Sequence, residues 1–174
     1  MKPRILARTE GMSRGDWLEL RRKGIGGSDA AAICGANPWR GPLSVYLTKI
    51  GASPDSDSNE AMEWGSELED TIAKVFSRRT QFKTKRCNYI LQHPEHDFML
   101  ANLDRLVKDD DEEGWGVLEV KNVGEYRKAD WEDGAVPEYY MIQVQHYMSV
   151  TGASYAWLAP LIGGNRMNPV KVMR

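Results

Sequence analysis

The sequence predicts an α/β fold of the α+β kind, in which helices and strands share one core. At 174 residues and 41% hydrophobic content, the chain is large enough for one domain with a substantial interior. Stretches with apolar residues at helical spacing alternate along the chain with short apolar runs that are typical of strands. An acidic linker that ends in glycine joins two of these runs, as the loop of a β-hairpin would.

Composition limits the classes of protein to which the chain can belong. The net charge of −2 gives no overall attraction to nucleic acid, so a DNA-binding surface would have to be a local patch. Two cysteines, Cys34 and Cys87, provide neither a disulfide framework nor the four ligands of an iron–sulfur cluster. The first residues lack the apolar core of a signal peptide, and no window approaches a membrane span. We therefore expect a cytoplasmic protein with no membrane association.

Two helix starts are predicted near the N-terminus. Ser13 is placed to cap a helix that runs through Arg22. The segment 24–35, GIGGSDAAAICG, predicts a tight turn, a second helix capped by Ser28, and an end at Gly35. A helix start with glycines and arginines beside it favours a bound phosphate. On the residues alone, a helix that is merely capped is the stronger alternative.

Gly41-Pro42 open a short predicted helix that ends at Gly51, and a polar linker follows at 53–58. A long helix is then predicted from about Glu60 to Arg79. Asn59 is placed to cap the long helix. Glu69 falls on its inward side, where a carboxylate needs a partner, although a boundary residue with a local ion pair fits the pattern equally well. Gly65 costs a helix interior about 1 kcal/mol, which suggests that another backbone or a nucleic acid approaches it closely.

The run from Phe98 to Asn122 predicts the central hairpin. A turn centred between Asp111 and Glu112 places Asp104 directly opposite Glu119, where opposed Cβ atoms lie roughly 5 Å apart. Lys121 shares a face with Glu119, because side chains alternate along a strand. Two carboxylates and one amine therefore converge on one face of the sheet.

Such a group favours a divalent cation. Carboxylates this close repel and raise each other's pKa. Lys121 relieves part of the repulsion, and hard oxygen donors are what Mg²⁺ selects. The alternative is an ordinary surface ion pair, but the neighbours Leu103, Leu118 and Val120 favour an interior position, where unpaired charge is costly.

The remaining elements complete the predicted fold. A strand is expected from Lys85 to Leu91. A basic cluster at the end of the long helix and the start of this strand fits a phosphate-tracking surface and a solvated helix end equally well; its members are Arg78, Arg79, Lys83, Lys85 and Arg86. His93 and His96 with Cys87 make an incomplete zinc set. A polar loop or short helix is expected at 124–134, a helix from Pro137 to Gly152, a core strand at 155–162, and a last strand near residue 167. Tyr140, Gln143 and Tyr147 share one helix face.

Four motifs carry a resemblance to a known family. The Asp104 and Glu119-Val120-Lys121 pattern resembles the D…(D/E)xK signature of the PD-(D/E)xK nuclease superfamily, with Leu103 in place of the usual proline. The segments RxxGIGGSDA, WGSELE and YxxQVQ resemble those of YqaJ-type viral recombinases, a group similar to the phage lambda-type alkaline exonucleases. The resemblance covers roughly residues 13–165. It implies a restriction-endonuclease-like core with a central mixed β-sheet flanked by helices, in a single nuclease domain over residues 1–174 that lacks the usual C-terminal extension.

The resemblance also implies residue roles. Two carboxylates and the Val120 backbone carbonyl would bind metal, and a helix glutamate would join them directly or through water. One arginine and one serine would hold a terminal 5′-phosphate, with Arg22 competing for the arginine's role. The implied catalytic residues are Glu69, Asp104, Glu119, Lys121 and Gln143, and the implied DNA- and phosphate-binding residues are Arg21, Ser28 and Tyr140.

The implied activity is a Mg²⁺-dependent exonuclease in which Mn²⁺ substitutes for Mg²⁺. It would degrade linear duplex DNA 5′→3′ from its ends and leave 3′ overhangs for phage-type recombination, in the cytoplasm of a bacterial host. Expected partners are double-stranded DNA ends, a single-strand annealing protein and, in a homotrimer, further copies of the chain. Two alternatives stay open: an endonuclease of the same superfamily, and a DNA-end-binding recombination protein without catalysis.

Overall fold

A computed structural model describes residues 2–53 and 59–174 of the chain. Its contacts divide these residues into two compact units, which are described separately. The first unit comprises residues 2–53, 88–102 and 138–152, and the second comprises 59–87, 103–137 and 153–174. Positions 54–58 of the predicted linker lie outside the described residues. The single domain stays a prediction. No helix in the described part of the chain is long and apolar enough to cross a membrane.

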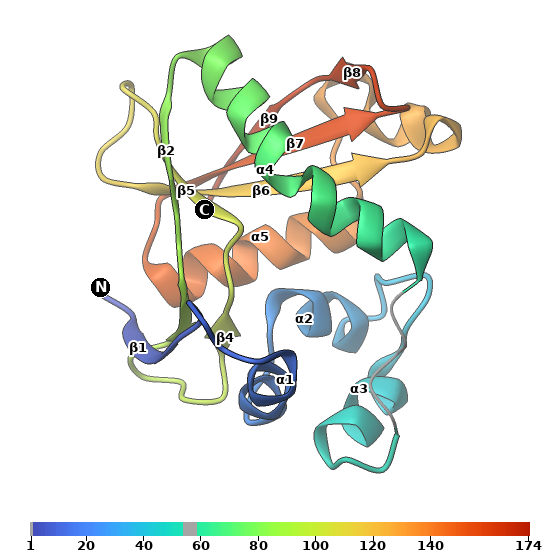
Figure 1. Cartoon of the computed structure of the whole chain (residues 1–174), viewed down its shortest axis with the longest axis vertical. Coiled ribbons are helices and arrows are strands. Elements are labelled where there is room, and N and C mark those ends of the chain that lie inside the picture. Colours follow the sequence, from blue (N-terminus) through green and yellow to red (C-terminus); the bar gives the residue numbers. More distant parts are fainter. Residues whose placement is uncertain (1, 54–58) are drawn as a thin grey trace. The chain divides into compact units, whose positions relative to one another are not determined.

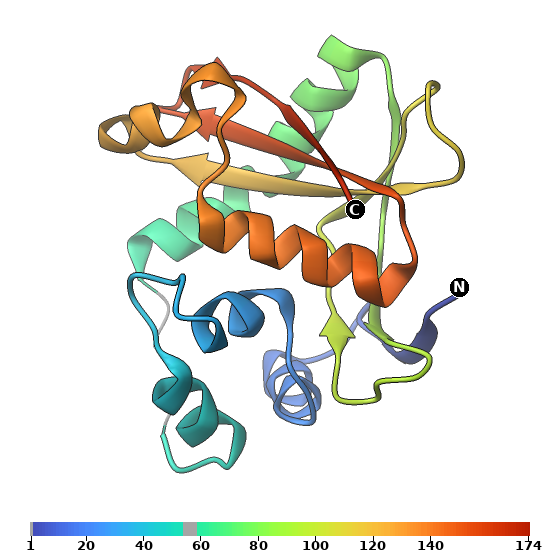
Figure 2. The same cartoon turned by 180° about the vertical axis from the view of Figure 1, so that it is seen from behind.

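The first unit combines a small antiparallel sheet with four helices. The sheet has the order β1-β3-β4, with bounds Arg4–Arg8, Tyr89–Gln92 and Leu100–Ala101. The helices are α1 (Arg14–Arg22), α2 (Gly27–Ile33), α3 (Pro42–Lys49) and α5 (Glu138–Thr151). Helix α5 lies alongside α2 and also contacts β3 and β4 (Figure 2). The contact with α2 brings two predicted functional segments of this unit together.

The helix starts of the first unit confirm one predicted cap and correct another. The Ser13 hydroxyl accepts a hydrogen bond from the backbone N–H of Asp16 at 3.1 Å, as predicted for α1. Helix α2 is capped by Gly26 and not by Ser28, which lies one residue inside the helix. The Asp29 carboxylate accepts a hydrogen bond from the Gly26 N–H at 3.1 Å, so it satisfies a donor at the start of this helix.

The second unit is a mixed sheet with helix α4 (Glu60–Thr80) on one face (Figure 1). The strand order is β2-β5-β6-β7-β8, and β9 also pairs with β7. Strands β6 and β7 are parallel and the other pairs are antiparallel, so the mixed sheet is as predicted. The strands are β2 (Lys83–Arg86), β5 (Arg105–Lys108), β6 (Gly116–Val123), β7 (Tyr155–Ile162), β8 (Arg166–Met167) and β9 (Val170–Met173). A short helical segment, η1 (Glu125–Gly134), follows β6.

The core of the second unit lies between α4 and the sheet. Ile72 and Phe76 of α4 pack in one cluster with Leu118 and Val120 of β6, and all four are nearly inaccessible to solvent. Since side chains alternate along β6, Glu119 and Lys121 project from the opposite face of the sheet. The apolar core thereby fixes the side on which the charged residues of β6 lie.

Two predicted strands have different bounds in the structure. The strand expected from Lys85 to Leu91 is two strands, β2 and β3, which belong to different sheets and are separated by Cys87 and Asn88. The hairpin expected from Phe98 begins only at Arg105, because Leu100 and Ala101 pair with β3 instead. Strand β1 was not predicted from the sequence.

Candidate functional site

The register of the β5–β6 hairpin brings the predicted carboxylates together. Arg105 pairs with Leu118, so Asp104, immediately before β5, lies opposite Glu119, as predicted. Glu119 is only 2% exposed and its Oε1 lies 2.5 Å from the Lys121 Nζ. Two acids and one amine therefore gather at the start of the hairpin in the second unit.

Asp104 has the most perturbed acidity of this group. Its Oδ2 accepts a hydrogen bond from the backbone N–H of Val120 at 2.9 Å. Burial and the negative charge of Glu119 nevertheless raise the pKa of Asp104 to about 7, against the opposing effects of Lys121, the Val120 hydrogen bond and Arg105. The two carboxylates repel each other, and a bound cation would reduce this repulsion.

The donor set suits a hard divalent cation. Asp104, Glu119 and the Val120 carbonyl offer oxygen atoms only, which is the chemistry that Mg²⁺ prefers. Across residues 2–53 and 59–174, no three His, Cys, Asp or Glu side chains gather closely enough to hold a metal ion by themselves. A site here would thus rely on two carboxylates, the backbone carbonyl and water, and this ligand set stays a prediction.

Glu69 projects from α4 toward the start of β5. Burial and the charge of Asp104 raise the pKa of Glu69, while Arg105 lowers it. Its Oε1 lies 2.5 Å from Nη1 of Arg105, so the inward carboxylate has the partner that the helix pattern required. The metal role predicted for Glu69, direct or through water, stays a prediction.

Arg105 and Asp70 also take part in this cluster, and neither was predicted from the sequence as a site residue. Asp70, the neighbour of Glu69 on α4, accepts from Arg105 at 2.7 Å and also pairs with Lys74 and Arg86 at 2.8 Å each. A signal for Arg105 was present: it precedes the buried Val107 by two residues, so it lies on the core-facing side of β5. A charge in that position requires an acidic partner.

The predicted phosphate-binding residues lie together in the first unit. Nη2 of Arg21 donates to the Ser28 hydroxyl at 3.4 Å, and the Arg21 guanidinium stacks 4.5 Å from the centre of the Trp17 ring. Arg22 instead pairs with Glu19 at 2.5 Å. The geometry favours Arg21 over Arg22 as the neighbour of Ser28, and phosphate binding stays a prediction for both Arg21 and Ser28.

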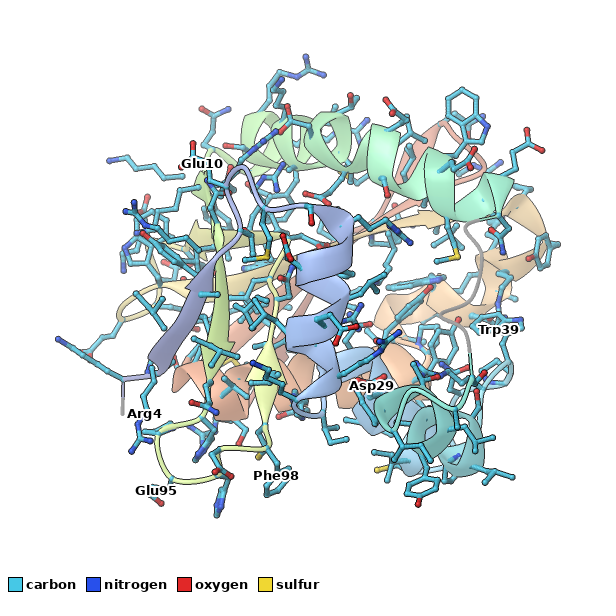
Figure 3. The ribbon with its side chains drawn as sticks, turned by 60° about the horizontal axis from the view of Figure 1, so that its bottom comes forward. Arg4, Glu10, Asp29, Trp39, Glu95 and Phe98 are labelled. Carbon is cyan, nitrogen blue, oxygen red and sulfur yellow. The ribbon has the colours of Figure 1, made fainter. Side chains whose placement is uncertain are left out.

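A buried acid organises the other cations near Ser28. Asp29 is 1% exposed and lies 2.9 Å from Arg40 Nη1 and 2.7 Å from Lys49 Nζ. Burial alone would raise the pKa of Asp29, but the hydrogen bond and charge of Lys49, the Gly26 hydrogen bond and the charge of Arg21 together outweigh it, so the pKa is lowered. Figure 3 labels Asp29 in this cluster and Trp39 on the loop that follows α2. Arg21, Arg40 and Lys49 outnumber this one carboxylate, which gives the cluster a positive charge suited to an anion.

Gln143 and Tyr140 lie on α5 in the same unit. Gln143 is buried, and its Nε2 donates to the Tyr147 hydroxyl at 3.1 Å. A Cβ atom at Gly27 would lie 2.9 Å from Gln143 and 2.7 Å from Tyr147, so only glycine allows α2 to approach α5 this closely. The ring of Tyr140 lies 4.2 Å from that of Tyr139. The catalytic role of Gln143 and the DNA-binding role of Tyr140 stay predictions.

Comparisons with known proteins agree on one family. The family described as YqaJ-like viral recombinase domain matches residues 16–154. The uncharacterized protein YqaJ of Bacillus subtilis (strain 168) is 47% identical over 165 residues, which cover 93% of this chain and 50% of that protein. The chain therefore spans about half the length of this curated relative.

Solved structures show the same fold. An alkaline exonuclease (LHK-Exo) from Laribacter hongkongensis matches with a TM-score of 0.72 at 18% identity, over 92% of this chain and 82% of that one. The same protein in complex with dAMP matches with a TM-score of 0.72 at 20% identity, over the same shares of both chains. A phage-related exonuclease from Haemophilus somnus 129PT matches with a TM-score of 0.56 at 13% identity, over 91% of this chain and 87% of that one.

Proposed function

The chain belongs to the YqaJ-like viral recombinase family, and from this premise we propose that it is a metal-dependent deoxyribonuclease. The proposed reaction is hydrolysis of phosphodiester bonds from the ends of linear duplex DNA in the 5′→3′ direction, which leaves 3′ single-stranded overhangs for phage-type recombination. The observation that carries the proposal is the placement of Asp104 opposite Glu119, with Lys121 bonded to Glu119 at 2.5 Å.

In this proposal the second unit supplies the chemistry. Asp104, Glu119 and the Val120 carbonyl would hold Mg²⁺, for which Mn²⁺ substitutes, and Glu69 would assist directly or through water. The bound ion would lower the pKa of a water molecule and offset negative charge on the phosphate. Lys121, already held by Glu119, would orient the attacking water and donate a hydrogen bond to the phosphate in the transition state.

The first unit would bind the DNA end. Arg21 and Ser28 would hold the terminal 5′-phosphate, which suits a guanidinium and a hydroxyl that already lie side by side. Gln143 would position the scissile phosphate or the water, and Tyr140 would contact the DNA. A monophosphate end carries close to two negative charges at neutral pH, so the positive cluster around Asp29 supports this role for the unit.

The solved relatives support the class of reaction. Two of them bear the name exonuclease, and one was crystallised with dAMP, a nucleoside monophosphate of the kind that exonuclease digestion releases. The chain spans half the length of its curated relative. The proposal therefore also includes that the chain assembles as a trimer, works with a single-strand annealing protein and acts in the cytoplasm of a bacterial host.

Digestion of defined substrates tests the proposal. The protein is incubated with linear duplex that carries 5′-phosphates, linear duplex that carries 5′-hydroxyls, and covalently closed circular duplex, each with Mg²⁺ or with EDTA. We expect Mg²⁺-dependent release of mononucleotides from the linear molecules, fastest with 5′-phosphates, and an intact circle. Cleavage of the circle would indicate an endonuclease. End binding without hydrolysis in Mg²⁺ or Mn²⁺ would indicate a recombination protein without catalysis.

A further inference from the structure

The Arg105 side chain contacts three oxygen atoms at the start of the hairpin. Its Nη1 lies 2.5 Å from Glu69 Oε1 and donates to the Asp104 backbone carbonyl at 2.5 Å. Its Nη2 lies 2.7 Å from Asp70 Oδ1. One guanidinium therefore joins two consecutive residues of α4 to the backbone of the residue that precedes β5.

Because the Arg105 side chain is buried, its charge has to be satisfied by these contacts. The Arg105 side chain is 8% exposed, whereas Arg86 and Lys74, which share Asp70 with it, are 60% and 78% exposed. A buried charge is tolerated when its donors are satisfied, and a guanidinium presents them in a rigid plane. The contacts therefore restrict the orientation of the Arg105 guanidinium and also the positions of the three oxygen atoms that accept from it.

The Asp104 carbonyl is the contact with consequences for the candidate metal centre. Asp104 lies just outside the regular pairing of β5, so the β5–β6 ladder does not fix its backbone as it fixes that of Arg105. The hydrogen bond from Arg105 supplies a constraint at this point. A rotation of this peptide would move the Asp104 carboxylate relative to Glu119.

We propose that Arg105 is a positioning residue for the candidate metal centre. It fixes the Asp104 backbone and the Glu69 carboxylate relative to each other without itself contacting metal or DNA. This inference rests on the proposed function. It adds Arg105, which is not one of the residues of the D…(D/E)xK motif, as a residue on which the positions of Asp104 and Glu69 depend. A lysine at this position keeps the positive charge but lacks the planar fork that reaches all three acceptors.

Direct binding of Mn²⁺ to the DNA-free protein tests the inference, by calorimetry on the wild type, Arg105→Lys and Arg86→Lys. Groups that orient metal ligands typically contribute about 10–100-fold to metal affinity. We expect a loss of that size in Arg105→Lys and none in Arg86→Lys, which alters an exposed partner of the same Asp70. Hydrolysis by Arg105→Lys should recover at high Mn²⁺ concentration, which loss of a purely structural ion pair would not produce.

A second variant covers the case in which Arg105→Lys does not fold. Asp70→Asn releases one end of the fork, and we expect a smaller loss of Mn²⁺ affinity in the same direction, with circular dichroism confirming the fold. Unchanged Mn²⁺ affinity in both variants, or in whichever of them folds, would overturn the positioning role while leaving the proposed function intact. A wild type that binds no Mn²⁺ would overturn the proposed function and this inference together.

Discussion

Replacing Glu119 with glutamine removes one negative charge from the candidate metal centre and hardly changes the shape of the side chain. Glu119 is 2% exposed, lies opposite Asp104 and bonds Lys121 at 2.5 Å. The variant therefore loses a charged oxygen donor for the cation and the counter-ion that holds Lys121. The fold should persist, because the amide oxygen still accepts a hydrogen bond from Lys121.

The size of the effect follows from electrostatics. Unit charges about 4 Å apart interact by about 4 kcal/mol at an effective dielectric constant of about 20. A loss of that size from the transition state lowers the rate roughly 10³-fold, since about 1.4 kcal/mol corresponds to a factor of ten. We therefore expect Glu119→Gln to reduce turnover by at least about 10²-fold.

The assay is single-turnover release of mononucleotides from 5′-phosphorylated linear duplex at saturating Mg²⁺. Glu67→Gln is the matched control, because Glu67 is exposed on α4 and should retain wild-type turnover. Circular dichroism and thermal unfolding establish that both variants are folded. A folded Glu119→Gln with turnover close to that of the wild type would refute the role assigned to this carboxylate.

Further predictions concern DNA-end recognition, packing and pH. Arg21→Gln should raise KM for 5′-phosphorylated ends more than for 5′-hydroxyl ends, because the guanidinium lies beside Ser28; equal effects on both ends would contradict the phosphate role. Gly65→Ala should raise the free energy of unfolding in urea by about 1 kcal/mol, since a Cβ atom there meets nothing within 4 Å. Gly27→Ala should lower it by about 1–3 kcal/mol, because its Cβ atom would lie 2.7 Å from Tyr147; a stabilised Gly27→Ala would contradict the packing of α2 on α5. Burial lowers the pKa of His146, so the unfolded chain binds this proton first, and the contribution of His146 to stability should fall as the pH falls from about 7 to about 5. In urea denaturation, the free energy of unfolding of the wild type relative to that of His146→Gln should therefore decrease over this range, and a difference that does not change with pH would count against the burial of a neutral histidine.

The sequence was sufficient where local periodicity and turn geometry decide the outcome. The register that places Asp104 opposite Glu119 follows from the midpoint of a short acidic turn, and the structure has this register. Helix α4 and its Asn59 cap were also predicted, because the apolar spacing and the cap lie within one segment. At Gly65, no other backbone approaches among the described residues, and the second alternative, close approach of a nucleic acid, stays a prediction.

Contacts between distant segments account for what the sequence did not show. Arg105 pairs with acids 35 and 36 residues away, and no pattern around it specifies which acids these are. Asp29 was interpreted only as part of a motif, yet it binds Lys49, whose position depends on how α3 packs. The break between β2 and β3 depends on the sheet that each strand joins, and strand propensity carries no information about partner choice.

The central claim is that Asp104 and Glu119 together hold a divalent cation. Anomalous diffraction from a crystal grown with Mn²⁺ measures this directly. We predict a manganese peak bonded to a carboxylate oxygen of each residue, with Lys121 still beside Glu119. Well-ordered crystals in which manganese binds elsewhere, while Asp104 and Glu119 contact only protein groups, would contradict it.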